Sequence, residues 1–162
     1  MIVVIKMAKI MFISSMGGHL SELLKLDKII KDNDSCVVTE TSKSTLFLKE
    51  TYKRVYYLIS GSKNYQKWLY PFRLIGNCFK SLYIYLKERP DYIITTGAHI
   101  AGPMCCIGKI FGSKIIYIET FANIETKTIT GRIVYHFADY FIVQWKEMLK
   151  LYPNAIYGGW IY

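Results

Sequence analysis

The sequence predicts an α/β fold: a Rossmann-like, mostly parallel β-sheet with helices on both faces. Short runs of β-branched residues alternate with longer segments of helical periodicity, which is typical of right-handed βαβ units. The runs 92–94 and 115–118 are apolar throughout, as strands buried on both faces require. Because 162 residues fit one domain and 52% of them are hydrophobic, we expect a single domain over residues 1–162.

The first half of the chain predicts three strands and two helices. The segment 19–31 has leucine and isoleucine at helical spacing, which indicates an amphipathic helix. The predicted elements are, in chain order, a strand over 8–14, a helix over 19–31, a strand over 35–40, a short helix over 44–52 and a strand over 54–59.

The second half begins with the longest helix, over residues 67–89, which Pro90 ends. Three further strands follow, over 91–95, 114–118 and 140–143. Because parallel strands end at the same edge of a sheet, and α/β proteins bind ligands there, the connections after these strands are the places to look for a site.

The balance of charge favours an anionic partner. Lys and Arg total 21 against 12 Asp and Glu, which gives a net charge of +9. The basic residues are interleaved with aromatic ones, including 14 tyrosines, and the sequence has no nucleic-acid-binding motif. This pattern is typical of a protein on an anionic membrane surface and argues against nucleic acid as a partner. No segment has the roughly 18 uncharged apolar residues of a spanning helix.

The four cysteines predict neither a disulfide framework nor a metal site. None of them forms C-x-x-C, and no Cys, His and Asp cluster has the spacing of metal ligands. We therefore expect a reduced compartment, no metal and no cofactor bound by this chain.

Two glycine turns follow predicted strands and precede helical segments. They contain Ser15, Gly17, Gly18 and His19 in the first turn, and Gly97, His99 and Gly102 in the second. Helix N-termini attract phosphate, and glycine lets the backbone approach it. Together the turns predict a site for one diphosphate, beside a histidine that can accept a proton. Each turn alone is equally consistent with a plain strand-to-helix connection and a capping or solvated histidine.

Glu119 follows the fifth predicted strand, at the same edge of the sheet. A carboxylate there can bond sugar hydroxyls or orient a histidine, so His19 and Glu119 are the candidate catalytic residues. The alternative for Glu119 is an ordinary acidic residue in the first turn of a helix, stabilised by the helix dipole.

The helix over 67–89 combines an apolar stripe with basic residues that recur every seven positions. The predicted membrane-binding residues are Trp68, Phe72, Arg73, Lys80 and Lys87. Aromatic rings and basic side chains with long apolar stems suit an anionic leaflet. The alternative is a crossover helix that packs on the sheet and whose basic flank is merely solvated. The helix can also do both, with one stripe on the sheet and a second towards lipid.

Residues 156–162 are rich in aromatic and apolar side chains. An exposed cluster of this kind marks a surface for a partner protein. The predicted interface residues are Tyr157, Trp160, Ile161 and Tyr162. The alternative is that this segment closes onto its own domain.

Five segments resemble the membrane-recruiting subunit of two-component glycosyltransferases. They are residues 14–22, 96–103, 119–122, 130–139 and 141–145, and the stretch from Glu119 to Trp145 is the most specific. The eukaryotic member of that family anchors its partner in dolichol-linked GlcNAc transfer, and bacterial members serve capsule and exopolysaccharide assembly. The glycine turns are also similar to those in the amino-terminal half of the single-chain GlcNAc transferase of peptidoglycan synthesis, a member of glycosyltransferase family 28.

The resemblance implies the amino-terminal, acceptor-side half of a GT-B glycosyltransferase that is split over two chains. This chain would bind a polyprenyl-diphosphate-linked sugar at the cytoplasmic face of the plasma membrane. A donor-side subunit would bring the UDP-sugar, and the pair would act as an inverting glycosyltransferase. By position, His19 is then the candidate base, and Gly17, Gly18, Gly97 and Gly102 form the diphosphate cradle. The alternative is a non-catalytic membrane scaffold for the partner.

Overall fold

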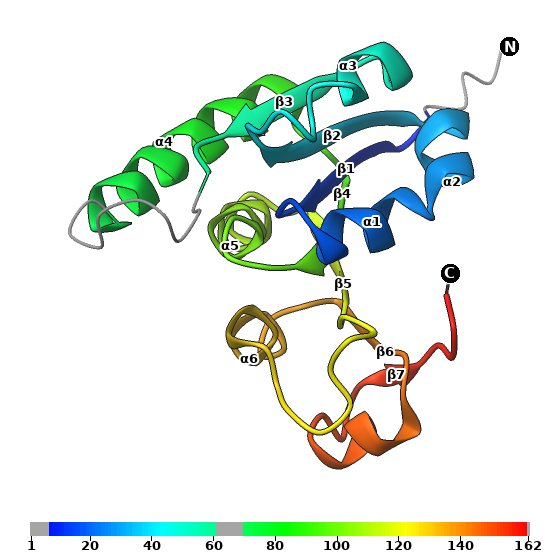
Figure 1. The fold of residues 1–162 in the computed structure, drawn as a ribbon. Coiled ribbons are helices and arrows are strands. Elements are labelled where there is room, and N and C mark those ends of the chain that lie inside the picture. The colour runs from blue at the N-terminus through cyan, green and yellow to red at the C-terminus, as the bar shows by residue number, and fades with distance from the viewer. Residues whose placement is uncertain (1–6, 61–69, 162) are drawn as a thin grey trace, which may run out of the picture.

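The computed structural model describes residues 7–60 and 70–161, which form one parallel sheet with helices on both faces (Figure 1). The strands are β1 (Lys9–Ser14), β2 (Asp34–Glu40), β3 (Val55–Leu58), β4 (Tyr92–Gly97), β5 (Lys114–Ile118), β6 (Tyr140–Val143) and β7 (Ile156–Tyr157). The helices are α1 (Gly18–Leu24), α2 (Asp27–Asp32), α3 (Leu48–Thr51), α4 (Tyr70–Glu88), α5 (Ala101–Ile110), α6 (Ile129–Val134) and the 3₁₀ helix η2 (Lys146–Lys150). The predicted fold class is confirmed.

The strands lie in the order β3-β2-β1-β4-β5-β6-β7. The chain therefore adds strands first on one side of β1 and then on the other side. The chain builds β1, β2 and β3 outwards, then crosses through α4 to β4, which pairs with the free side of β1. The register places Ser14 opposite Gly97, so the two strands end together. In open parallel sheets the crevice at such a reversal is where ligands bind.

Two layers of helices bury the two faces of the sheet (Figure 1). Met11 and Ile13 point to the core beneath α4, α5 and α6, whereas Phe12 points to the core beneath α1, α2 and α3. This alternation follows from the two-residue period of a strand. Gly108 lets α5 approach the sheet closely, because a Cβ at this position would overlap the Ile93 side chain.

The segment predicted as one helix over 19–31 forms two helices instead, with a break at Leu26. Leu26 leaves the helical conformation, with ψ of 19°, yet its side chain is only 9% exposed. The break lets Leu23, Leu26 and Ile30 enter the same core cluster. Burial outweighs helical continuity here because short helices are stabilised mainly by packing.

Two further elements differ from the prediction. The segment 44–52 is helical only over Leu48–Thr51. The Thr45 hydroxyl, which contacts the Glu40 carbonyl oxygen at 2.8 Å, supports a turn before it, as threonine often does. The strand β7 was not predicted and adds to the edge of the sheet beside β6.

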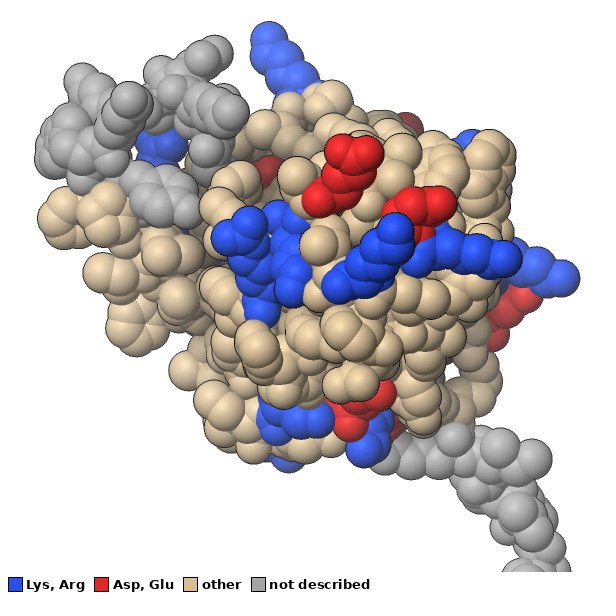
Figure 2. All heavy atoms as spheres, turned by 90° about the horizontal axis from the view of Figure 1, so that it is seen from below, with Lys and Arg blue, Asp and Glu red and all other residues tan. Residues whose placement is uncertain are grey.

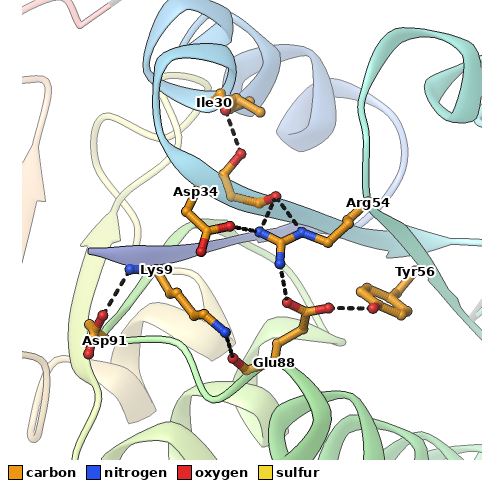
Figure 3. A network of polar contacts seen from close by, with 8 residues as sticks. Lys9, Ile30, Asp34, Arg54, Tyr56, Glu88 and Asp91 are labelled. Atoms are coloured by element: carbon orange, nitrogen blue, oxygen red, sulfur yellow. Dashed lines mark hydrogen bonds and ion pairs between the residues drawn. The ribbon is translucent and has the colours of Figure 1, made fainter. Parts of the chain in front are cut away.

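Charged residues close the amino edge of the sheet, opposite the candidate site (Figure 3). Arg54, which precedes β3, forms ion pairs with Asp34 at the start of β2 and with Glu88 at the end of α4. The Lys9 amide donates a hydrogen bond to Asp91 at 2.8 Å, and the Lys9 ammonium lies 3.4 Å from the Glu88 carbonyl oxygen. These contacts tie α4 to the first strands of the sheet.

Candidate functional site

The two glycine turns lie side by side at the carboxyl edge, where the strand order reverses. Ser14 is in register with Gly97. The Thr96 hydroxyl lies 3.0 Å from the Ser14 Oγ and 2.7 Å from the His19 carbonyl oxygen. The structure therefore brings the two turns together, as the parallel strands predict, and one ligand can touch both.

Three residues of these turns have a positive φ, which favours glycine. The φ angles are 92° at Gly17, 99° at Gly97 and 73° at Ala98. A Cβ at Gly97 would lie 2.6 Å from the Tyr117 hydroxyl oxygen, so this glycine is packed tightly. A Cβ at Gly17 or Gly18 would meet nothing within 4 Å. The first turn thus leaves its backbone open to a ligand. Ala98 in the second turn has a conformation that is strained for a residue with a side chain.

The half-buried ring of His19 is held by the backbone. Its Nδ1 lies 2.9 Å from the Thr96 carbonyl oxygen. Because a carbonyl can only accept, Nδ1 carries the hydrogen in this contact, and the neutral ring then has its lone pair on Nε2. That tautomer suits a general base. Glu119 was one candidate for orienting His19, but the group that does so is the Thr96 carbonyl, which no sequence pattern identifies.

Glu119 is 1% exposed, and both of its carboxylate oxygens are bonded. It accepts hydrogen bonds from the Tyr152 hydroxyl at 2.9 Å, from the Thr128 hydroxyl at 3.0 Å and from the Thr120 amide at 3.2 Å. Burial raises the pKa of Glu119 above its usual range, while these hydrogen bonds and the nearby His19 act to lower it. The carboxylate is therefore part of the buried framework.

Thr128 couples Glu119 to helix α6. The Thr128 hydroxyl oxygen accepts a hydrogen bond from the Gly131 amide at 2.9 Å and so caps the helix. A Cβ at Gly131 would overlap the Glu119 carboxylate and the Tyr152 hydroxyl, so the packing is close. In this position Glu119 supports the start of helix α6.

A groove of about 650 Å³ opens beside the turns, with walls from α4, α5 and α6. The predicted residues His19, His99 and Gly102 line it, and Lys127 adds another basic side chain. Ser15 is buried at the end of β1, and its Oγ has no hydrogen-bond partner among the described residues. Buried hydroxyls are normally bonded, so this one is suited to a ligand or a water molecule.

Helix α4 turns its aromatic side outwards. Phe72, Phe79 and Tyr83 are 66%, 71% and 65% exposed. On the opposite side, Asn77 is buried and pairs with both backbone polar groups of Ile59, at 2.8 and 2.9 Å. Helix α4 is therefore a crossover helix that packs on the sheet, with Ile84 and Tyr85 buried in the core, and that also turns its aromatic stripe outwards. The sheet side of α4 combines buried apolar residues with the polar pair between Asn77 and Ile59, and a periodicity argument does not detect that pair.

The predicted basic flank of α4 is divided in the structure. Lys80 is exposed and Arg73 is half-buried. The Lys87 ammonium lies 5.2 Å from the centre of the Tyr56 ring, so it extends towards β3. Trp68 lies outside the described residues. In the part of the chain that the structure describes, no helix has both the length and the hydropathy to cross a bilayer.

The carboxyl-terminal segment packs partly on its own domain. Ile161 contacts the core cluster beneath α1 and α2, so it belongs to the domain and not to an open surface. Trp160 is 71% exposed and meets the Phe121 ring edge-on at 5.1 Å between centroids. Tyr157 is exposed as well, and Tyr162 lies outside the described residues. Trp160 and Tyr157 thus remain available to a partner.

Sequence reasoning missed Thr96, Lys127, Thr128 and Tyr152. Thr128 carried a usable signal, since threonine before an apolar helical run is a common N-cap. The contacts of Thr96 and Tyr152 gave no signal in the sequence, because their partners are distant. Thr96 contacts His19, 77 positions away, and Tyr152 contacts Glu119, 33 positions away.

Figure 2 shows the face at the bottom of Figure 1, where basic side chains are spread in several groups over a largely uncharged surface. The basic character of the chain is therefore not gathered into one patch on this face. Among the described residues, no group of three or more His, Cys, Asp and Glu side chains could hold a metal ion. The absence of a metal or cofactor stays a prediction.

Solved structures share this fold at low sequence identity. MurG from Acinetobacter baumannii aligns with a TM-score of 0.67 at 15% identity, over 86% of this chain and 42% of that one. UDP-GlcNAc 2-epimerase from Neisseria meningitidis, bound to UDP-GlcNAc, aligns with a TM-score of 0.62 at 10% identity, over 84% and 40%. The chain thus spans about two fifths of the length of these structures.

Sequence comparison gives matches over most of the chain. This chain is 26% identical over 175 residues to the UDP-N-acetylglucosamine transferase subunit ALG14 of Rattus norvegicus, and the match covers 93% of this chain and 81% of that protein. It is 26% identical over 164 residues to the subunit alg14 of Schizosaccharomyces pombe, covering 88% and 78%. Residues 9–161 match the family model described as "Oligosaccharide biosynthesis protein Alg14 like". This chain therefore belongs to the Alg14 family.

Proposed function

We propose that this chain is the acceptor-side subunit of a heteromeric, inverting glycosyltransferase in lipid-linked oligosaccharide biosynthesis. It binds a polyprenyl-diphosphate-linked sugar at the membrane and recruits a donor-side subunit that binds a UDP-sugar. The observation that carries the proposal is the pair of joined glycine turns, with His19 held between them by Thr96. The matched relatives, named as UDP-N-acetylglucosamine transferase subunits, support it.

The family description refers to oligosaccharide biosynthesis, so capsule and exopolysaccharide assembly are not part of the proposal. The donor nucleotide is assigned to the partner chain. This assignment is supported by the names of the matched relatives, which are subunits of a transferase.

The transfer requires a hydroxyl of the acceptor sugar to lose its proton as its oxygen attacks the anomeric carbon of the donor. The new carbon–oxygen bond forms opposite the leaving phosphate, and UDP departs with the electron pair of the broken bond. We assign the proton to His19 Nε2, because the Thr96 carbonyl holds the hydrogen on Nδ1. A base placed in this way contributes about 10²–10⁴-fold to the rate.

The acceptor diphosphate fits between the first turn and the basic end of the groove. The backbone at Gly17 and Gly18 is open to close approach. Lys127 supplies a positive charge, and Gly102 lies in the first turn of α5, where backbone N–H groups favour phosphate.

The outward stripe of α4 is the proposed membrane contact. Phe72, Phe79 and Tyr83 are exposed together along one side of the helix, near the exposed Lys80. Rings that enter the headgroup region, with lysine close by, bind an anionic surface without crossing it. We propose peripheral attachment at the cytoplasmic face, where anionic lipids are enriched.

Trp160 and Tyr157 are the proposed contact for the donor-side subunit. The Trp160 ring meets edge-on the ring of Phe121, which follows β5 at the same edge of the sheet as His19. A partner that covers Trp160 would therefore lie beside the acceptor site. Exposed tryptophan and tyrosine are common anchors in protein interfaces.

Turnover of the pair, reconstituted from purified subunits, tests the proposal. We expect His19→Ala to lower turnover at least 100-fold, as loss of a general base does, while the complex still co-purifies. His136→Ala is the matched control, because His136 is exposed and lies outside the groove. Unchanged turnover in His19→Ala would remove His19 from the mechanism. Full activity of the partner alone on a soluble acceptor would establish the scaffold alternative.

A further inference from the structure

The groove between α4, α5 and α6 joins a basic region to an apolar one. His19, His99 and Lys127 come from the carboxyl edge of the sheet, immediately before or within the first turn of α1, α5 and α6. Cys106 and Ile133 lie about one helical turn further along α5 and α6 and also line the groove. A ligand that fills the groove therefore meets the Lys127 ammonium group and two histidines at one end and apolar side chains along the rest.

The apolar walls of this groove are open to solvent in the isolated chain. Ile129, Ile133 and Leu74 are 76%, 53% and 39% exposed. On α4, Leu74 is followed by Ile75, which is 54% exposed and belongs to the outward stripe with Phe79. One wall of the groove therefore belongs to the helix that carries the surface assigned to the membrane. Contiguous exposed apolar surface of this kind marks a binding site.

We propose that this groove binds the first prenyl units of the acceptor lipid, an inference that rests on the proposed function. The diphosphate lies at the basic end near His19 and Lys127, and the chain runs between Leu74 and Ile129 towards the bilayer. Charge complementarity at one end and apolar walls along the rest suit a prenyl diphosphate. A free phosphate or a nucleotide would use only the basic end.

The native cysteines provide a direct measurement. Cys78 and Cys106 line the groove, whereas Cys36 and Cys105 are buried in the core. Maleimide alkylation of the folded, full-length chain therefore reports on the groove. We expect farnesyl diphosphate to slow alkylation of Cys78 and Cys106 by about tenfold, whereas inorganic diphosphate leaves the rate within about twofold, because it buries no apolar surface.

Two equally exposed isoleucines give a matched pair of variants. Ile129 lines the groove and is 76% exposed, while Ile110, at the end of α5, is 79% exposed and does not line it. Neither is packed in the core, so both variants are expected to fold. Ile129→Glu should abolish the protection by farnesyl diphosphate, and Ile110→Glu should retain it.

Three results would overturn the inference: equal protection by inorganic diphosphate, equal protection by a lysophosphatidic acid, or full protection in Ile129→Glu. Turnover of the reconstituted pair separates this failure from failure of the proposed function. If Ile129→Glu keeps normal turnover and KM on a lipid-linked acceptor, the prenyl groove is wrong and the transferase role stands. The His19→Ala measurement tests that role by itself.

Discussion

The two edges of the parallel sheet carry polar groups in opposite ways. At the amino edge, charges are paired with charges: Arg54 joins Asp34 and Glu88, and Glu88 also accepts a hydrogen bond from Tyr56 (Figure 3). Asp139, between β5 and β6 at the same edge, pairs with two lysines. Such pairing fixes strands in place and leaves little for a ligand to bind.

At the carboxyl edge, the candidate functional groups are bonded to neutral partners. His19 contacts a backbone carbonyl, Glu119 accepts from hydroxyl and amide groups, and Ser15 Oγ has no partner within the described residues. The backbone of Gly17 and Gly18 faces open space. The comparison teaches that side chains in ion pairs stabilise the fold and have no free valence for a ligand. Side chains that are oriented by hydrogen bonds to uncharged groups still have an atom that can contact a ligand.

The largest expected effect is at the amino edge and is on stability alone. Arg54→Ala leaves the buried Glu88 carboxylate without its cation, so we expect the free energy of unfolding to fall by about 3 kcal/mol. Turnover per folded molecule should stay unchanged. Urea unfolding measures the free energy of unfolding, and an assay of the reconstituted pair measures turnover.

Lys31→Ala is the control for Arg54→Ala. It removes an exposed ion pair with Asp27 and should cost about 0.5 kcal/mol or less. A large loss of turnover per folded molecule in Arg54→Ala would break the division between the two edges.

Tyr152→Phe should affect both stability and turnover. It removes the hydroxyl that donates to the buried Glu119, so we expect a loss of about 2 kcal/mol, as for hydrogen bonds to charged groups. Turnover should also fall, because Glu119 holds Thr128 and α6. Tyr85→Phe, which loses a contact with Ser113, is the control and should cost about 1 kcal/mol with normal turnover.

Acid should weaken the amino edge through Asp139. Although burial acts to raise the pKa of this carboxyl, the Ile115 amide and two lysine ammonium groups lower it from 3.8 to about 2. The ionised form thus stabilises the fold fully above about pH 4, and that contribution, about 1–2 kcal/mol, is lost as the pH falls towards 2. Denaturant titration between pH 5 and 2 should show this slope, and Asp139→Asn should reduce it.

The smallest effect on stability is expected at the open turn. Gly18→Ala adds a Cβ that meets nothing within 4 Å in the first turn of α1, so the free energy of unfolding should change by less than about 0.5 kcal/mol. If the diphosphate lies there, the same methyl group should raise KM for the acceptor about threefold or more. An unchanged KM would show that this space is not used by the acceptor.

Periodicity and apolar runs identified most of the fold. The predicted strands over 8–14, 35–40, 91–95, 114–118 and 140–143 all correspond to strands of the sheet. The two glycine turns were placed at one edge because parallel strands end together. The break at Leu26 was missed, because a helical pattern continues through it and only the shape of the core favours a bend.

The sequence identified several residues of the candidate site but not the contacts that define their roles. His19 and the glycines are local features that a sequence displays. Three other features cannot be recognised in the sequence. They are the carbonyl that orients His19, the hydroxyls that surround Glu119 and the outward direction of the α4 aromatic side chains. Each of these depends on partners that the sheet topology brings together from distant positions.

By itself, the sequence determined the α/β class, the edge of the sheet that carries the glycine turns and the amphipathic character of α4, because each depends on local spacing. The tertiary structure decided that Thr96 sets the His19 tautomer, that Glu119 supports α6 and that α4 turns its aromatic side outwards. The physical reason is that hydrogen-bond partners and buried faces are chosen by the strand order β2-β1-β4-β5, which no short window of sequence contains.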